Sequence, residues 1–408
     1  MAIRWLLSLS SRYYRKIPLA IREPFTPVLY KYYYRVRSDF YALYPMVFVF
    51  EGQARGNGLA LSFAYAGSDD ATREYWSHTL LTSSFKKHSL GRCFFLRVLP
   101  VLKKKHFNCD FIFIEHLYLT LQFFGRTQGF RIPSWIKMEI TLPNLDKKVW
   151  QAKKADIQRL IRKHHLEFEL SRDPDRFDEF YYGMHVPYIK ERFEEAALVE
   201  DPKDLRDAYA RGGLLLVKKG PEVLAGVLFE YLPQKVRLRK LGVRDANWQY
   251  VRWGVISAMY YFVMLEMEKE GYEKILIGGT RPLLTDGVTR YKISVNARLL
   301  PVIGGTCLWL RLLKDTPALK DFLTRNPFVY FPKPNQPRRA IFLNVDPDFK
   351  PERIEEIVQD SACEGITGTD LFVFGEVGTL QDSIATAQNC PLTIKPARDL
   401  FVDQGGAR

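Results

Sequence analysis

Three short β-runs followed by a long apolar helix most constrain how this chain can fold. Turn residues separate the runs, with Gly220 and Pro221 in the first turn and Pro233 in the second. Residues 250–270 have the length and apolar content of a buried helix, and residues 274–277 form a short strand after it. The pattern predicts an antiparallel meander, a crossover helix and a return strand. The β-runs are residues 214–218, 226–231 and 236–243.

The loop after the return strand, residues 278–299, concentrates charge. Gly278 and Gly279 end the strand and permit close backbone approach. Cations, a carboxylate and a phenol then follow within twelve residues, which is compatible with a substrate site or with an ordinary strand-loop corner carrying solvated charges. Asp286 precedes a glycine and also fits a turn. The polar residues of the loop are Arg281, Asp286, Arg290, Tyr291 and Lys292.

Strand and helix signals continue on both sides of this unit. A basic amphipathic helix is predicted at residues 147–165, and a helical stretch at residues 175–193 that Pro187 divides. The N-terminal part predicts a helix at residues 71–87 among several strands. Those expected strands are residues 46–51, 59–65, 94–99, 111–114 and 136–142. The fold class is therefore α/β (α+β).

Composition shifts divide the chain into five predicted segments. A proline-rich stretch separates the body from a C-terminal unit whose expected order is strand, helix, strand, helix, strand. That unit holds twelve Asp or Glu against five Lys or Arg, so it carries −7 and the rest of the chain +21. We expect it to contact another protein or to form a dimer, and a role in covering the basic body is also compatible with its charge. The segments are an arm (1–45), a first half (46–145), a second half (146–315), a linker (316–339) and a small acidic parallel α/β domain (340–408).

The basic body predicts an anionic partner. The arm holds eight Lys or Arg and eight tyrosines, a pattern compatible with an anionic membrane surface, with stacking on RNA bases, or with packing on the body. No run approaches the roughly 20 apolar residues of a transmembrane helix, so a cytoplasmic protein, peripheral at the inner face of the membrane, is expected. Five scattered cysteines and seven histidines lack ligand spacing, so no metal is predicted. The oligomeric state stays open.

Several stretches in this order resemble the FemAB-like branch of the GNAT acyltransferase superfamily, over residues 45–315. They are SRDPDRFDEFYYGMHVPYIKERF, LLLVKKGPEVLAGVLFEY, KVRLRKLGV and, after the long helix, GGTRP with DGVTRYK. The resemblance implies two tandem GNAT-like halves with mixed central sheets. It also implies transfer of an acyl or aminoacyl group to an amine or hydroxyl of a small metabolite or a cell-envelope or polysaccharide precursor, without a metal.

Roles for individual residues follow from the resemblance. Strand 236–243 would bind the pantetheine arm of an acyl-CoA donor, and Tyr291 would act as general acid with Lys292 beside it. A phosphate site would lie at the start of the long helix, and cations of the loop would bind phosphate or carboxylate. The implied donor-binding residues are Leu241, Gly242, Val243, Arg244, Arg252 and Gly254. The implied substrate-binding residues are Arg281, Asp286, Arg290, His185 and Tyr188.

Two departures from the family pattern bear on the donor. Residues 252–257 read RWGVIS and lack the full phosphate loop of many GNAT proteins. FemAB-type enzymes lack it as well and use aminoacyl-tRNA, but the heptad arm that some of them insert is missing from this sequence. We therefore expect an acyl-CoA donor. The alternatives are an aminoacyl-tRNA-dependent transferase and a membrane-associated assembly protein without catalysis.

Overall fold

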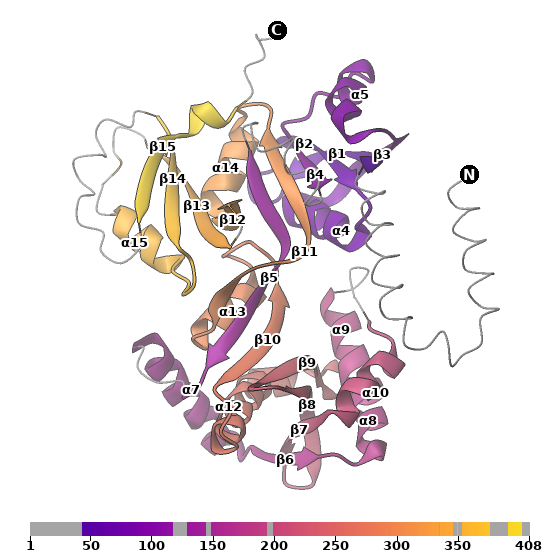
Figure 1. The fold of residues 1–408 in the computed structure, drawn as a ribbon, viewed down its shortest axis with the longest axis vertical. Coiled ribbons are helices and arrows are strands. Elements are labelled where there is room, and N and C mark those ends of the chain that lie inside the picture. The colour runs from indigo at the N-terminus through magenta and orange to yellow at the C-terminus, as the bar shows by residue number, and fades with distance from the viewer. Residues whose placement is uncertain are drawn as a thin grey trace, which may run out of the picture.

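The computed structural model describes residues 43–116, 129–143, 148–193, 199–333, 335–345, 349, 353–375 and 391–401. An eleven-stranded mixed sheet forms the body, and a four-stranded sheet forms the C-terminal unit (Figure 1). The order in the large sheet is β3-β1-β2-β4-β11-β5-β10-β9-β8-β7-β6, and in the small sheet β12-β13-β14-β15. The predicted fold class is confirmed.

Within the described residues, the first half consists of five strands and three helical segments, and β11 continues its sheet from later in the chain. The strands are β1 (Met46–Ala54), β2 (Ala60–Gly67), β3 (Leu81–Arg92), β4 (Phe111–His116), β5 (Phe130–Thr141) and β11 (Arg298–Leu312). The helices are α4 (Asp70–Leu80), the 3-10 turn η1 (Phe95–Arg97) and α5 (Val98–Lys104).

The second half adds the following elements. The strands are β6 (Glu167–Ser171), β7 (Gly212–Lys219), β8 (Glu222–Leu232), β9 (Lys235–Val243) and β10 (Lys274–Thr280). The helices are α7 (Lys148–His164), α8 (Pro174–Phe180), the π-helical turn η3 (Tyr181–His185), α9 (Val186–Phe193), α10 (Pro202–Ala210), η5 (Arg244–Ala246), α11 (Trp248–Arg252), α12 (Val255–Lys269) and α13 (Gly287–Ser294).

Two long strands join the halves into one sheet. β5 pairs antiparallel with β11 along one part of its length and with β10 along another. β11 also pairs antiparallel with β4 of the first half. Figure 1 shows β5 running from the upper into the lower part of the molecule. The two halves are thus hydrogen-bonded through a shared strand pair, which no local pattern in the sequence indicates.

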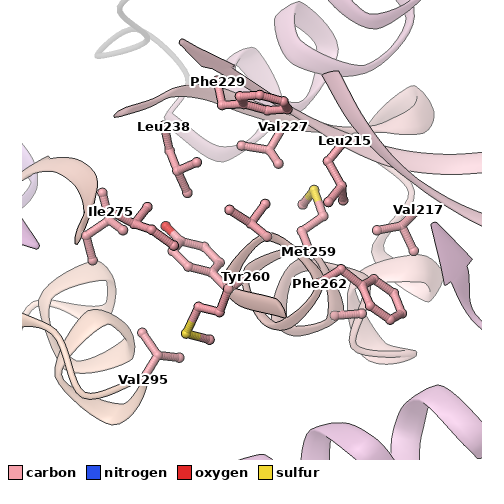
Figure 2. Close-up of a cluster of buried hydrophobic side chains, with 14 of the residues drawn as sticks. Leu215, Val217, Val227, Phe229, Leu238, Met259, Tyr260, Phe262, Ile275 and Val295 are labelled. Atoms are coloured by element: carbon pink, nitrogen blue, oxygen red, sulfur yellow. The ribbon is translucent and has the colours of Figure 1, made fainter. Parts of the chain in front are cut away.

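The second half has a core on each face of its sheet. Side chains alternate along β7 and β8, so Leu215 and Val227 join the core under α12 while Leu216 and Leu228 join the core under α8 and α10. Figure 2 shows the α12 core, in which the Tyr260 ring of the helix lies among strand and helix side chains. The predicted antiparallel meander is confirmed, since β7 pairs with β8 and β8 with β9 in that sense.

The structure corrects two expectations in the first half. Residues 94–99 were expected as a strand, but residues 95–99 lie in η1 and the start of α5. Phe95, Val98 and Leu102 are all buried, and their spacing of three and four residues is helical. The helix expected at residues 71–87 ends at Leu80, and β3 begins at Leu81 without a loop. Tertiary pairing with β1 decides that boundary.

The C-terminal unit shares its core with the body. Its elements are α14 (Pro317–Arg325), β12 (Phe328–Lys333), β13 (Gln336–Asn344), α15 (Arg353–Asp360), β14 (Gly368–Phe374) and β15 (Leu392–Pro396). β13, β14 and β15 are parallel, and β12 adds an antiparallel edge. The range expected as a linker, 316–339, holds α14, β12 and the beginning of β13.

Some expectations fall on other parts of the chain. The helix expected at residues 380–388 and nearly all of the basic arm, up to residue 42, lie outside the described residues. No helix within the described ranges is long and apolar enough to cross a membrane.

Candidate functional site

Strands β9 and β10 diverge in the middle of the second half. Their parallel pairing covers only two register positions, Ile275 with Val236 and Leu276 with Arg237. Beyond Arg237, β9 pairs with β8 alone within the described part of the chain. An irregularity in β10 between Leu276 and Gly279 accompanies the divergence. Backbone groups at the edge of β9 are therefore available to partners other than a strand.

The segment α8–η3–α9 lies at this divergence and reaches both faces of the sheet. Phe180 and Met184 belong to the core under α8 and α10, whereas Tyr188 belongs to the core under α12. In Figure 1, α8, α9 and α10 lie on one side of the lower strands, and α12 lies on the other. The π-helical turn η3 separates the two contact sets, and such turns are frequent at functional sites.

His185 lies at the free edge of β9. Its Nδ1 donates to the carbonyl oxygen of Leu241 at 2.8 Å, which leaves the lone pair of the neutral ring on Nε2. His185 is 1 % exposed, and Nε2 has no hydrogen-bond partner among the described residues. Burial, with the nearby charge of Lys240, lowers the pKa of His185, although the bond to Leu241 opposes this shift. At neutral pH the ring is an unprotonated base.

Gly242 brings η3 onto β9. A Cβ built at this position would lie 2.5 Å from the backbone N of His185 and from the backbone C of Met184. We expect Gly242→Ala to lower the free energy of unfolding by about 1–3 kcal/mol, because two backbones must separate to admit the methyl group. Chemical denaturation measures the loss.

Gly183→Ala is the matched control for this prediction. Gly183 lies in the same turn, but its built Cβ meets no atom within 4 Å. Its replacement should change stability by less than half the loss seen at Gly242. Equal losses in the two variants would contradict close packing of η3 on β9.

Helix α13 carries the two candidate catalytic residues in different surroundings. The Tyr291 hydroxyl donates to Ser257 Oγ at 3.3 Å, and its ring meets that of Tyr260 edge-on. Burial raises the pKa of Tyr291 strongly, so the phenol is a weak acid. Lys292 Nζ donates to the carbonyl oxygen of Gly279 at 2.8 Å, and burial lowers the pKa of Lys292 to about 7.

The other polar residues of the loop have different partners, although the charge of Asp286 favours the protonated form of Lys292. Asp286 caps α13 by accepting from the backbone N of Val288 and Thr289, at 3.0 and 3.1 Å. Arg290 is exposed. Arg281 is 9 % exposed and lies against the first half, with its guanidinium 3.9 Å from the ring centre of Trp135.

Arg281 ties the loop to helix α4. Its guanidinium donates to Thr72 Oγ1 and to the Ser134 carbonyl oxygen, both at 3.2 Å, and lies 4.3 Å from the ring centre of Tyr75. Burial lowers the pKa of Arg281, against nearby tyrosines and carboxylates that favour its charge. These contacts link Arg281 to residues of the first half, and none of them involves the edge of β9.

The start of α12 is surrounded by cations. Gly254 precedes the helix with a φ of 87°, which a glycine adopts readily, and it has no side chain to cap the first N–H groups. Lys219 lies 4.6 Å from the ring centre of Trp253, and His164 stacks on that ring at 5.3 Å. Arg252 is exposed. Free N–H groups and cations make this helix start suited to a phosphate.

His164 and Lys219, which were not among the predicted site residues, also lie at the start of α12. Some burial lowers the pKa of His164, and so do the charges of Lys163, Lys219 and Arg159. The lowered pKa reports a positive potential that an anion would relieve. Lys219 ends a strand far from α12 in the chain, so only the tertiary structure places it there. Of the two remaining predicted donor residues, Val243 is fully buried in the core under α12, and Arg244 bonds the Val223 carbonyl and Glu179.

Predicted site residues thus fall into several separate places. His185 and Leu241 meet at the edge of β9, next to Gly242. Tyr188 and Tyr291 share the core under α12, and Tyr188 accepts a hydrogen bond from Arg192 at 2.7 Å. The start of α12, Arg281 and Lys292 each have their own surroundings. Among the described residues, no group of three or more His, Cys, Asp or Glu is arranged to hold a metal ion.

No family model matches the chain, and no curated protein matches it. Similar solved structures include FemX, with 14 % identity and a TM-score of 0.36 over 63 % of this chain and 82 % of that one. L-PGS from Bacillus licheniformis has 10 % identity and a TM-score of 0.34, over 67 % and 88 %. A GCN5-related N-acetyltransferase from Sphaerobacter thermophilus has 10 % identity and a TM-score of 0.30, over 62 % and 76 %.

These similarities are distant, and the fold and the site described above rest on the geometry of this chain alone. They include FemX and a GCN5-related acetyltransferase, which are the kinds of protein that the sequence motifs resemble.

Proposed function

We propose that this protein is a GNAT-type acyltransferase that moves an acyl group from acyl-CoA to an amine or hydroxyl of a small metabolite or cell-envelope or polysaccharide precursor. The observation that carries the proposal is the divergence of β9 from β10 beside the cationic start of α12. A strand edge can hydrogen-bond an extended amide-containing arm, and an uncapped helix start with cations can hold its phosphates.

The donor fits these residues in a definite way. Phosphates would meet the first N–H groups of α12, with Lys219 and Arg252 supplying charge. The pantetheine arm would pair with β9 between Leu238 and Lys240, since His185 already occupies the carbonyl of Leu241. A backbone N–H of β9 would then polarise the thioester carbonyl.

The reaction requires one proton acceptor and one proton donor. The acceptor amine attacks the thioester carbon, a bond to nitrogen or oxygen forms, and the carbon–sulfur bond breaks. The attacking group loses a proton, and the CoA thiolate gains one. His185 Nε2, an unpartnered base at the edge of β9, would take the first proton. Tyr291 is the donor that the sequence predicts for the thiolate, but it lies in the core under α12 and burial makes its phenol a weak acid, so the Tyr291→Phe variant is the test of this role.

Acetyl-CoA should therefore stabilise the folded protein. Ligand at one hundred times its dissociation constant adds about 2.7 kcal/mol to the free energy of unfolding. We expect a rise in melting temperature with acetyl-CoA and with CoA, and a roughly tenfold weaker affinity in Lys219→Glu. Thermal-shift titration measures both. Lys235→Glu, a charge reversal at the opposite end of β9, should bind acetyl-CoA as the wild type does.

Other outcomes separate the competing functions. Salt-sensitive tRNA binding in a gel shift, without any stabilisation by thioesters, would indicate an aminoacyl-tRNA donor, because phosphate contacts release counterions. Absence of both would indicate a protein without transferase activity. Unchanged product formation in Tyr291→Phe would remove the phenol from the mechanism and leave His185 as the residue to test.

A further inference from the structure

The first half carries a long stretch of sequence without acidic residues. Between Glu74 and Asp110 there are seven Lys or Arg and no Asp or Glu. This stretch forms most of α4, then β3, η1 and α5. In Figure 1, α5 lies at the outer edge of the molecule, beyond β1, β2 and β3. The charged side chains of this peripheral stretch are therefore all positive.

Segment η1–α5 is anchored on its inner side. Phe95, Val98 and Leu102 are at most 4 % exposed and join the core over β1, β2 and β4. Leu96 points the other way and is 54 % exposed, and Pro100 is exposed as well. A spacing of four residues places Leu96 and Pro100 on one face of the helical segment. A rigid support thus presents an apolar tip to solvent.

Cations surround that tip. Arg97, Lys103, Lys104 and Lys105 are all exposed, and none forms an ion pair with a described carboxylate. The spacing from Leu96 through Pro100 to Lys103 continues along the same face. We name this set, Leu96, Arg97, Pro100 and Lys103 to Lys105, the α5 surface. Exposed cations around an apolar tip are the composition of an interfacial membrane contact.

Tyr44 lies beside the α5 surface. Tyr44, at the end of the basic and tyrosine-rich segment 1–45, is 43 % exposed, and its ring lies 5.6 Å from that of Phe94. Arg92 Nη1 donates to the Tyr44 carbonyl oxygen at 2.9 Å. Tyr44 therefore extends the α5 surface with an aromatic ring, a residue type enriched at membrane interfaces.

We propose that the α5 surface docks the protein on an anionic lipid bilayer. Cations at this position would lie at the depth of the lipid headgroups, with Leu96 and Tyr44 inserted among them. RNA fits less well, since the most exposed apolar side chain of the α5 surface is an aliphatic leucine, and base recognition relies on stacking with aromatic rings. The proposal is independent of the transferase activity.

Co-sedimentation of the full chain with vesicles tests the proposal. We expect binding to vesicles of 30 % phosphatidylglycerol in phosphatidylcholine, no binding to pure phosphatidylcholine, and weaker binding as salt increases. The triple variant Lys103→Glu/Lys104→Glu/Lys105→Glu should bind at least tenfold more weakly. The control Lys203→Glu/Lys269→Glu/Lys274→Glu changes the net charge equally, from exposed sites in the second half, and should bind within twofold of the wild type.

A second pair of variants isolates the apolar tip. Leu96→Ser should weaken vesicle binding several-fold, whereas Leu170→Ser, at a leucine that is 40 % exposed on β6, should not. Circular dichroism melts establish that each variant is folded. Equal binding by the two triple variants would overturn the proposal and assign any membrane contact to the arm alone. Unchanged vesicle binding with lost tRNA binding in the α5 triple variant would overturn it in favour of RNA.

Discussion

Phe130→Ala should lower the free energy of unfolding by about 3–5 kcal/mol, the range for removing a large buried aromatic side chain. Phe130, at the start of β5, is 2 % exposed and is surrounded by rings of the C-terminal unit. Its ring centre lies 5.2 Å from those of Phe328, Tyr330 and Phe372 and 5.9 Å from that of Phe342. Urea unfolding measures the loss.

Backbone hydrogen bonds reinforce the contact between Phe130 and the C-terminal unit. Truncation of Phe130 should therefore affect the C-terminal unit as well as the body. Leu284 N donates to the Pro327 carbonyl oxygen at 2.8 Å, and Val329 N to that of Pro282 at 2.9 Å. These bonds join the loop after β10 to β12. Hydrogen exchange should therefore accelerate in β13 and β14 when Phe130 is truncated, because the small sheet loses its main apolar contact with the body.

Phe63→Ala provides the control for that prediction. Phe63 is fully buried and stacks on Phe50 and Phe111 within the first half. Its truncation should cost a similar free energy without a selective increase of exchange in β13 and β14. If both variants accelerate exchange in the same strands, the C-terminal unit unfolds with the whole body, and Phe130 has no special place at the interface.

Lys292→Met should abolish a pH dependence of stability that the wild type shows between pH 7 and pH 10. The unfolded chain holds a lysine with the ordinary pKa of 10.5, whereas burial lowers the pKa of Lys292 in the folded protein to about 7. The unfolded state therefore binds more protons in this range, and folded stability rises with pH. Below pH 7 both states are protonated, and the penalty stays constant.

The size of the effect follows from the two pKa values. Each tenfold difference in proton affinity corresponds to 1.36 kcal/mol, so the wild type should gain about 3 kcal/mol relative to Lys292→Met from pH 7 to pH 10. Urea unfolding across this range measures the difference. Other groups titrate alike in both proteins and cancel. Parallel curves for the two proteins would show that Lys292 keeps an ordinary pKa.

Arg290→Met controls for the loss of a cation in the same helix. Arg290 is exposed two residues before Lys292. The free energy of unfolding of the Arg290→Met variant should change with pH as that of the wild type does. Lys292 also bears on the candidate site. Its hydrogen bond to the carbonyl oxygen of Gly279 holds the end of β10 near the point where β9 and β10 diverge. An effect on activity in Lys292→Met would then accompany the change in stability.

The second half could be predicted closely because its signals are local. Alternating side chains and turn residues at Gly220 and Pro233 produce β7, β8 and β9, and Gly220 has the positive φ of 58° that its turn uses. The apolar run at residues 250–270 became α11 and α12, interrupted at Gly254. The basic amphipathic pattern became α7. Each signal involves residues within one or two turns or strands.

The candidate site depended on contacts that are distant in the chain. Asp286 was expected to bind substrate or to form a turn with Gly287, and the structure shows it as the N-cap of helix α13. Arg281 was expected to bind substrate as one of the cations of the loop. In the structure its guanidinium lies over the rings of Tyr75 and Trp135. These rings come from α4 and β5, so the sequence around Arg281 could not indicate the contact. Likewise, only the folded chain places Lys219 at the start of α12.

The sequence by itself determined the fold class, the meander, the buried helix and the separation of charge, because side-chain periodicity and turn chemistry act over a few residues. The tertiary structure decided that β5 and β11 merge both halves into one sheet, that residues 95–99 are helical, and that η3 covers Gly242. Those outcomes depend on burial between segments far apart in the chain. The free energy of such burial belongs to the whole packed arrangement and leaves no signal in any single segment.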